Sequence, residues 1–107
     1  MATDRIRGNL DLLLLAALAS GPAHGYELAA SIRERSAGEF DLAEGTVYPA
    51  LHALESRGLI TSSWQVFAGR RRRVYEISAA GRSARDRQAA DWQRFASNMN
   101  QVLGAPS

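Results

Sequence analysis

Cysteine and lysine are both missing from this chain of 107 residues. Without cysteine the protein forms no disulfide, holds no metal through thiolates and has no cysteine nucleophile, which is consistent with the reducing cytoplasm. Proline is scarce, with three residues, so few positions interrupt helices. The length suits one domain with a single core and excludes a second large domain.

The chain also has no long hydrophobic run. The longest, from Leu12 to Ala19, is far shorter than the roughly 18 residues that a helix needs to cross a bilayer. A small-residue cleavage site of the A-x-A kind does not follow it, so a secretory signal peptide is not indicated either. We therefore expect a cytoplasmic protein without a membrane partner.

Residues for catalysis are few. There are two histidines, and the chain contains no H-E-x-x-H, no G-x-S-x-G and no phosphate-binding glycine loop. No set of side chains is assembled for nucleophilic, metal or acid–base chemistry. We expect no enzyme activity, no metal site and no cofactor.

The charges that are present are unevenly placed. All 13 basic residues are arginine, against 11 acids; GC-rich codon usage produces such a bias, but arginine also suits phosphate and guanine. Residues 1–69 hold 5 arginines and 8 acids, whereas residues 70–107 hold 8 arginines and 3 acids. Half of the second group is the run Arg70–Arg73. One strongly electropositive spot is therefore expected near residue 70.

Hydrophobic periodicity predicts three helices in the first half of the chain. The first is apolar on more than one side and stops at Ser20-Gly21-Pro22, and the third buries Val47, Leu51 and Leu54 and closes at Gly58. The predicted ranges are Leu10–Ala19, His24–Ser36 and about Glu44–Arg57.

Pro49 leaves the start of the third helix open. If Thr46 is the N-cap, the proline occupies the third helical position, where its missing N–H costs nothing. If the helix starts earlier, one backbone hydrogen bond is lost. In both cases the first turns display Thr46, Tyr48 and Pro49.

A β-hairpin and a last helix follow. Residues Leu59–Phe67 and Arg72–Ile77 have the composition of strands, and Ala68-Gly69 between them marks a turn, so the arginine run is expected at the hairpin tip. Ser78 is a plausible N-cap for a helix of about 25 residues. The predicted fold is mainly α with a β-hairpin wing: a winged helix-turn-helix domain over residues 1–78 and a C-terminal dimerisation helix over residues 79–107.

A winged helix places its third helix in the DNA major groove and its hairpin on the backbone or the adjacent minor groove. Hydroxyls at the start of that helix can contact phosphates and base edges, and arginines neutralise phosphates. The predicted DNA-binding residues are Thr46, Tyr48, Pro49, His52, Arg70, Arg71, Arg72 and Arg73.

These residues also have structural interpretations. The arginines can form a solvated turn, although an unbroken run of like charge is costly without an anion. Tyr48 can be a half-buried helix residue, and His52 a solvated one. His24, beside Gly25 at the start of the second helix, is expected to be structural.

The first and last helices have more apolar surface than one small core covers, so a second copy of the chain is the simplest cover. A two-fold dimer would read a roughly palindromic operator. The predicted dimerisation residues are Leu10, Leu14, Ala89, Trp92, Phe95, Ala96, Met99 and Leu103.

Several spaced motifs stand out along the chain. They are His24–Leu28 (HGYEL), Gly45–Leu51 (GTVYPAL), Leu54–Ile60 (LESRGLI), Gly69–Tyr75 (GRRRRVY), Ile77-Ser78 and Gly81. Together these motifs resemble the PadR family of transcriptional regulators. The resemblance covers about residues 6–103 and implies a cytoplasmic, dimeric winged-helix repressor. Where relatives often carry a capping residue two positions before the glycine of their G-T-x-Y motif, this chain has Ala43.

The short C-terminal tail is similar to that of a small PadR subfamily, some members of which bind flat aromatic or cationic drugs between the subunits. This resemblance implies a ligand stacked on Trp92, with Asp11 and Leu12 facing the same space. Asp91 beside Trp92 also suits a cationic aromatic ligand. The alternative for Trp92 is a packed residue of the dimer interface.

The leading hypothesis is a homodimeric DNA-binding repressor that a small-molecule inducer releases. The alternative is a winged-helix protein-interaction module whose basic hairpin docks an acidic partner without binding DNA. A gel shift with DNA distinguishes the two.

Overall fold

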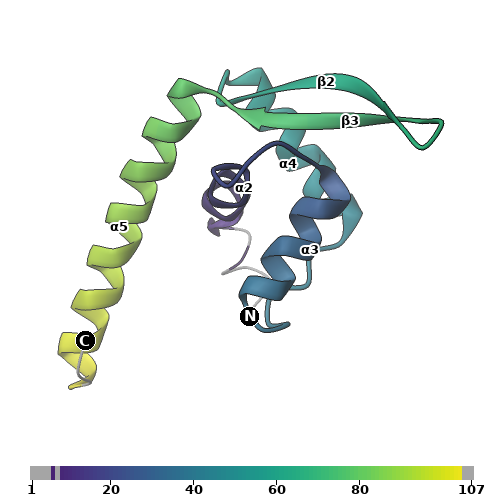
Figure 1. Cartoon of the computed structure of the whole chain (residues 1–107). Coiled ribbons are helices and arrows are strands. Elements are labelled where there is room, and N and C mark those ends of the chain that lie inside the picture. The colour runs from purple at the N-terminus through teal and green to yellow at the C-terminus, as the bar shows by residue number, and fades with distance from the viewer. Residues whose placement is uncertain (1–5, 7, 105–107) are drawn as a thin grey trace.

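The structure, a computed structural model, describes residue 6 and residues 8–104. A small sheet lies along one edge of a group of helices, and a long last helix projects to one side while the hairpin projects to the other (Figure 1). This arrangement confirms the predicted fold class, mainly α with a hairpin wing. In chain order the elements are α2 (Leu10–Leu18), β1 (Ala23–His24), α3 (Gly25–Arg35), α4 (Glu44–Ser56), β2 (Ile60–Phe67), β3 (Arg70–Ile77) and α5 (Ala79–Leu103).

Helix α2 lies in the middle of the molecule, between α5 and the pair α3 and α4 (Figure 1). Its leucines are buried because helices cover it on several sides. Leu14 is fully buried and Leu10 is nearly so, so neither offers a surface to a second subunit. Their assignment to a dimer interface is therefore wrong: both belong to the core of the protomer. The fully buried large side chains are Leu14, Leu15, Leu18, Leu28, Val47, Leu51, Leu54 and Ile60.

The start of α3 is fixed by a reciprocal cap. The backbone N–H of Glu27 donates to Nδ1 of His24 over 3.3 Å, and the N–H of His24 donates to Oε1 of Glu27 over 3.1 Å. This arrangement satisfies two N–H groups that the helix itself leaves unpaired. The structural role expected for His24 is confirmed.

Helix α4 begins before Thr46. Its N-cap is Ala43, whose carbonyl accepts from the N–H groups of Thr46 and Val47 over 2.9 and 3.0 Å. Pro49 therefore stands inside the helix and has no N–H for the carbonyl of Gly45. Of the two alternatives for this helix, the structure has the earlier start.

The sheet has the strand order β1-β3-β2, and all pairs are antiparallel. Ala68 and Gly69 connect β2 to β3 with φ values of 53° and 77°, which is the backbone of a type I′ hairpin turn. Strand β3 begins directly after this turn, at Arg70 and not at Arg72. The arginine run therefore lies in the half of β3 next to the turn, at the tip end of the hairpin as expected. Only the predicted start of the strand, at Arg72, is wrong.

Helix α5 starts against the end of β3. The hydroxyl of Ser78 accepts from the N–H of Gly81 over 3.0 Å and donates to the carbonyl of Gly58 over 2.7 Å, which confirms the predicted N-cap. A side chain on Gly81 would overlap the carbonyl oxygen of Leu59 and the side chain of Ile77. Glycine is therefore required where the last helix leaves the sheet.

We expect Gly81→Ala to lower the free energy of unfolding by about 3 kcal/mol, because the added methyl group meets backbone that cannot move alone. Urea unfolding at a fixed protein concentration measures the loss. Gly45→Ala is the matched control, since Gly45 also lies in a first helical turn but has open space around it. A Gly81→Ala protein as stable as this control would contradict the close contact of Gly81 with Leu59 and Ile77.

No helix among residues 6 and 8–104 has both the length and the apolar character of a membrane span.

Candidate nucleic-acid interface

The first turns of α4 present one buried and one exposed face. Val47, Leu51 and Leu54 pack into the core, as their spacing predicts. The four residues predicted from α4 to contact DNA, Thr46, Tyr48, Pro49 and His52, are all exposed. The buried face fixes the helix and leaves the opposite face available to a ligand as large as duplex DNA.

Tyr48 has a defined position within that face. Its ring lies over Gly25 at the start of α3, so closely that a Cβ on Gly25 would stand 2.7 Å from the ring edge. The side chain is nevertheless 43% exposed. Tyr48 therefore packs on a neighbouring helix, as its structural interpretation expects, and part of its side chain stays exposed.

The four wing arginines divide between the two faces of the hairpin. Arg71 and Arg73 pair across the sheet with Val66 and Trp64, whereas Arg70 and Arg72 pair with Phe67 and Gln65. Residues directly opposite each other share a face, and neighbours along a strand alternate. Two guanidinium groups therefore start from each face.

Aromatic rings on β2 hold three of these guanidinium groups. Arg71 and Arg73 lie over the ring of Trp64 at 4.8 and 5.2 Å from its centre, and Arg72 lies over the ring of Phe67 at 5.2 Å. Cation–π contacts of this kind restrict flexible arginine side chains. Sequence reasoning missed Trp64, although the pairing follows from the two-residue turn: residues equidistant from Ala68-Gly69 lie opposite each other.

Glu55 ties the wing to α4. Its Oε2 accepts from the hydroxyl of Ser62 on β2 over 2.6 Å and lies 3.8 Å from Nη2 of Arg73 on β3. Burial raises the pKa of the neighbouring Tyr75, and the charge of Arg73 partly opposes this rise. The Tyr75 hydroxyl therefore stays neutral at physiological pH and does not reduce the positive charge beside α4.

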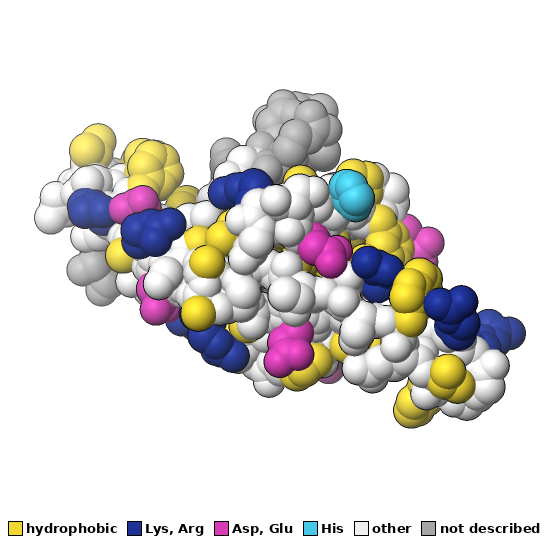
Figure 2. Space-filling model, turned by 90° about the horizontal axis from the view of Figure 1, so that it is seen from above, with side chains coloured by type: hydrophobic (Ala, Val, Ile, Leu, Met, Phe, Trp, Pro, Cys, Tyr) yellow, Lys and Arg dark blue, Asp and Glu magenta, His cyan; other side chains and the backbone are white. Residues whose placement is uncertain are grey.

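The exposed faces of α4 and the wing meet in one hollow. Tyr48, His52, Glu55 and Ser56 of α4 line it together with Arg73 and Tyr75 of β3, and its volume is about 520 Å³. Figure 2 shows dark-blue arginine side chains interleaved with hydrophobic ones toward the hairpin end of the molecule. Of the predicted DNA-binding residues, the structure thus brings Tyr48, His52 and Arg73 together in this hollow. The others, Thr46, Pro49, Arg70, Arg71 and Arg72, do not line it.

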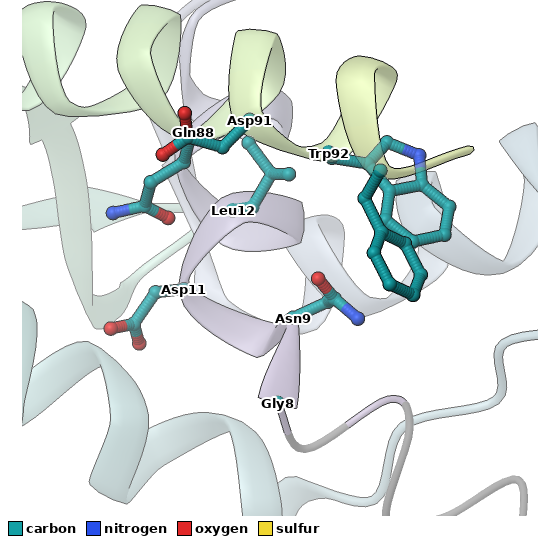
Figure 3. A pocket seen from close by; sticks show the side chains of 8 residues that line it. Gly8, Asn9, Asp11, Leu12, Gln88, Asp91 and Trp92 are labelled. Atoms are coloured by element: carbon teal, nitrogen blue, oxygen red, sulfur yellow. The ribbon is translucent and has the colours of Figure 1, made fainter. Parts of the chain in front are cut away.

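A second candidate site lies between α2 and α5, where Asp11, Leu12 and Trp92 line one open pocket of about 510 Å³. Figure 3 shows Asp11 and Leu12 on α2 and Trp92 on α5, on the two sides of this space. The Asp11 carboxylate is 3.0 Å from Arg57 at the end of α4, and Asp91 is 2.6 Å from Arg94. Both acids near Trp92 therefore already have arginine partners.

The outer half of α5 carries an apolar stripe that this protomer does not cover. Trp92 is 44% exposed, Phe95 56%, Met99 47% and Leu103 71%, and the rings of Trp92 and Phe95 have their centres 5.8 Å apart. Ala89 and Ala96 on the same helix are partly buried. This stripe contains the predicted dimerisation residues that lie outside the core.

A grouping of histidine and carboxylate side chains suited to a metal ion is absent from the part of the chain that the structure describes.

Comparison with known proteins assigns the fold. The model of the transcriptional regulator PadR-like family matches residues 14–87, from α2 to the first turns of α5. The chain belongs to the PadR family of transcriptional regulators. The match includes α4, the wing and the start of α5, so the surface described above is part of the PadR winged helix.

Individual transcriptional regulators and their structures are also similar to this chain. Transcriptional regulator Rv3488 of Mycobacterium tuberculosis is 39% identical over 87 residues, which cover 79% of this chain and 78% of that protein. A transcriptional regulator of Clostridium thermocellum has a TM-score of 0.84 at 30% identity, covering 92% of this chain and 96% of its own. A PadR family transcription regulator of Clostridium difficile R20291 has a TM-score of 0.80 at 35% identity, covering 89% and 98%.

Proposed function

We propose that this PadR-family chain is a cytoplasmic, homodimeric repressor that binds double-stranded DNA through α4 and the wing. The observation that carries the proposal is the shared hollow in which Tyr48 and His52 of α4 meet Arg73 of β3. Helix side chains near base edges and arginines near phosphates are the two parts that specific DNA binding needs. In this proposal residues 1–78 form the DNA-binding unit and residues 79–107 the dimerisation helix.

The second subunit would cover the apolar stripe of α5. An isologous two-fold contact places the same stripe from both copies together and needs no other partner. It also places two copies of α4 on one side of the dimer, at a spacing that a roughly palindromic operator has to match. The exposure of four apolar side chains in the protomer supports this arrangement, because a second subunit would cover them. They are Trp92, Phe95, Met99 and Leu103.

The pocket at Trp92 suits a small aromatic or cationic effector. The indole offers a stacking face, and Asp11 and Leu12 stand on the opposite helix. Because the pocket joins α2 to α5, a ligand there would change how the proposed dimerisation helix sits on the DNA-binding unit and so shift the spacing of the two α4 helices. Release of DNA follows from that change of spacing.

Titration with tetraphenylphosphonium, a non-intercalating aromatic cation, tests the effector site. In a Trp64→Phe protein Trp92 is the only tryptophan, so its fluorescence reports on this pocket alone. We expect saturable quenching that disappears with Asp11→Asn and Asp91→Asn together. Quenching that is absent or that ignores both carboxylates removes the cationic effector from the proposal.

A gel shift with the DNA upstream of the chain's own gene, at physiological salt, tests DNA binding. We expect a complex at nanomolar protein and a footprint with two halves about one helical turn or more apart. The absence of a shift at micromolar protein would exclude DNA binding of this kind and favour docking of an acidic protein partner.

Tyr48→Ala is expected to lower affinity for the footprinted operator about tenfold and affinity for random DNA much less, because one contact to a base is worth about 1–3 kcal/mol. Fluorescence anisotropy with both duplexes measures the two losses. Ser83→Ala, at an exposed position of α5, is the control. An equal loss on both duplexes would contradict base reading by Tyr48 and assign it to the backbone.

A further inference from the structure

A separate hollow of about 380 Å³ lies between the start of α3, the start of α4 and the wing. The wing contributes one indole ring and three guanidinium groups to it, and the helices contribute two phenols. Its lining residues are His24, Tyr26, Tyr48, Trp64, Arg71, Arg72 and Arg73.

This hollow has an excess of positive charge. Among the ion pairs of the described residues, the wing arginines take part in one, between Arg73 and Glu55 at 3.8 Å. Oε1 of Glu27 on α3 lies 3.2 Å from Nε2 of His24. Arg71 is held by the ring of Trp64, and Nη1 of Arg72 lies 3.1 Å from Nε2 of His24. Guanidinium groups this close together repel one another, and an anion bound between them offsets the free-energy cost of that repulsion.

Trp64 holds the positive groups in place. It is 54% exposed, so burial of its own surface does not explain its position. It instead contacts two arginines at once, Arg71 and Arg73, which would otherwise separate into solvent. Because less side-chain entropy is lost when an arginine is already restrained, this contact favours binding of an anion.

We propose that this hollow binds one phosphodiester of the DNA backbone and that Trp64 is its positioning residue. The inference rests on the proposed DNA binding and adds α3 to the interface: Tyr26, 64% exposed, and Tyr48 line the hollow together with the arginines, and their hydroxyls would donate to the phosphate. The phosphate is held between the helix-turn-helix and the wing, so it fixes the angle of the wing relative to α4. Backbone contacts of this kind set the register on the duplex.

The test is the slope of log affinity against log salt for Trp64→Ala, since each phosphate contact contributes about 0.9 to that slope. Although the change removes no charge, we expect the slope to fall by about 1 or 2 per dimer and affinity at 0.1 M salt to fall about tenfold. Trp64→Phe, which keeps a ring face, is expected to restore the slope. Thr61→Ala, on the same strand but opposite Glu76 and away from the hollow, is the control.

An unaltered slope in a folded Trp64→Ala protein, with normal DNA binding by the unaltered chain, overturns the phosphate site and leaves the proposed function standing. Failure of the unaltered chain to bind any duplex overturns both. A second arm replaces chloride by inorganic phosphate at equal ionic strength. A loss of DNA affinity greater than tenfold in 10 mM phosphate reassigns the hollow to a free anion and so overturns its assignment to the DNA backbone.

Discussion

Met99→Glu is expected to convert the protein into a monomer at micromolar concentration and to lower its operator affinity at least 100-fold. Met99 lies in the middle of the uncovered stripe of α5 and is 47% exposed in the protomer. In the proposed dimer each subunit would bury a new carboxylate in an apolar contact, which costs several kcal/mol. A monomer also has one α4 and one wing, so it loses about half of the DNA contacts. Sedimentation equilibrium and anisotropy with the operator measure the two effects.

Gln101→Glu is the matched control, because it adds the same charge to an exposed position on the other side of the same helix. It is expected to leave the dimer intact. Dissociation by both variants would point to the added charge and not to the apolar stripe. A Met99→Glu protein that stays dimeric would place the dimer interface elsewhere and remove α5 from it.

Replacement of all four wing arginines, Arg70–Arg73, by alanine is expected to weaken binding to operator and random DNA alike by about 100-fold or more at low salt. Two arginines start from each face of the hairpin, and a single groove or backbone strand is reached from one side. If half of them contact phosphates, a dimer loses about four contacts and the slope of log affinity against log salt falls by about 4. Titrations with DNA at several salt concentrations measure this slope.

Arg82→Ala with Arg87→Ala is the control for net charge. Both arginines are exposed on α5, away from the wing. The loss of DNA affinity per arginine is therefore expected to be small, and the slope of log affinity against log salt nearly unchanged. An equal loss per arginine in both proteins would mean that only the overall charge matters. An unchanged slope in the wing variant would exclude the wing from DNA binding.

The faces of the wing could be predicted from the sequence to a useful degree. Ala68-Gly69 marks a two-residue turn, and such a turn fixes which residues of β2 and β3 lie opposite each other. The sequence prediction began the second strand at Arg72 instead of Arg70. A run of four like charges has no period-2 pattern of hydrophobicity, so the usual signal for a strand is missing there.

The start of α4 could not be predicted from the local sequence. The sequence left two alternatives for Pro49, and the earlier helix start is the observed one although Ala43 provides no side-chain cap. Burial of Val47, Leu51 and Leu54 stabilises the helix more than a missing cap or a missing hydrogen bond weakens it. Strand β1 was not predicted for a related reason: two residues are too short for a pattern, and they pair only because β3 lies beside them.

By itself the sequence determined the order of the helices and the hairpin, the buried face of α4, the N-cap of α5 and the presence of a basic hairpin, because periodicity, capping and turn chemistry act over a few neighbouring residues. Its lack of cysteine excluded disulfides, thiolate metal sites and a cysteine nucleophile. Only the tertiary structure decided that Leu10 and Leu14 belong to the core. It also brought His24, Tyr26 and Tyr48 to the arginines around Trp64. Such contacts join residues distant in the chain, and their positions depend on how whole helices pack against the sheet.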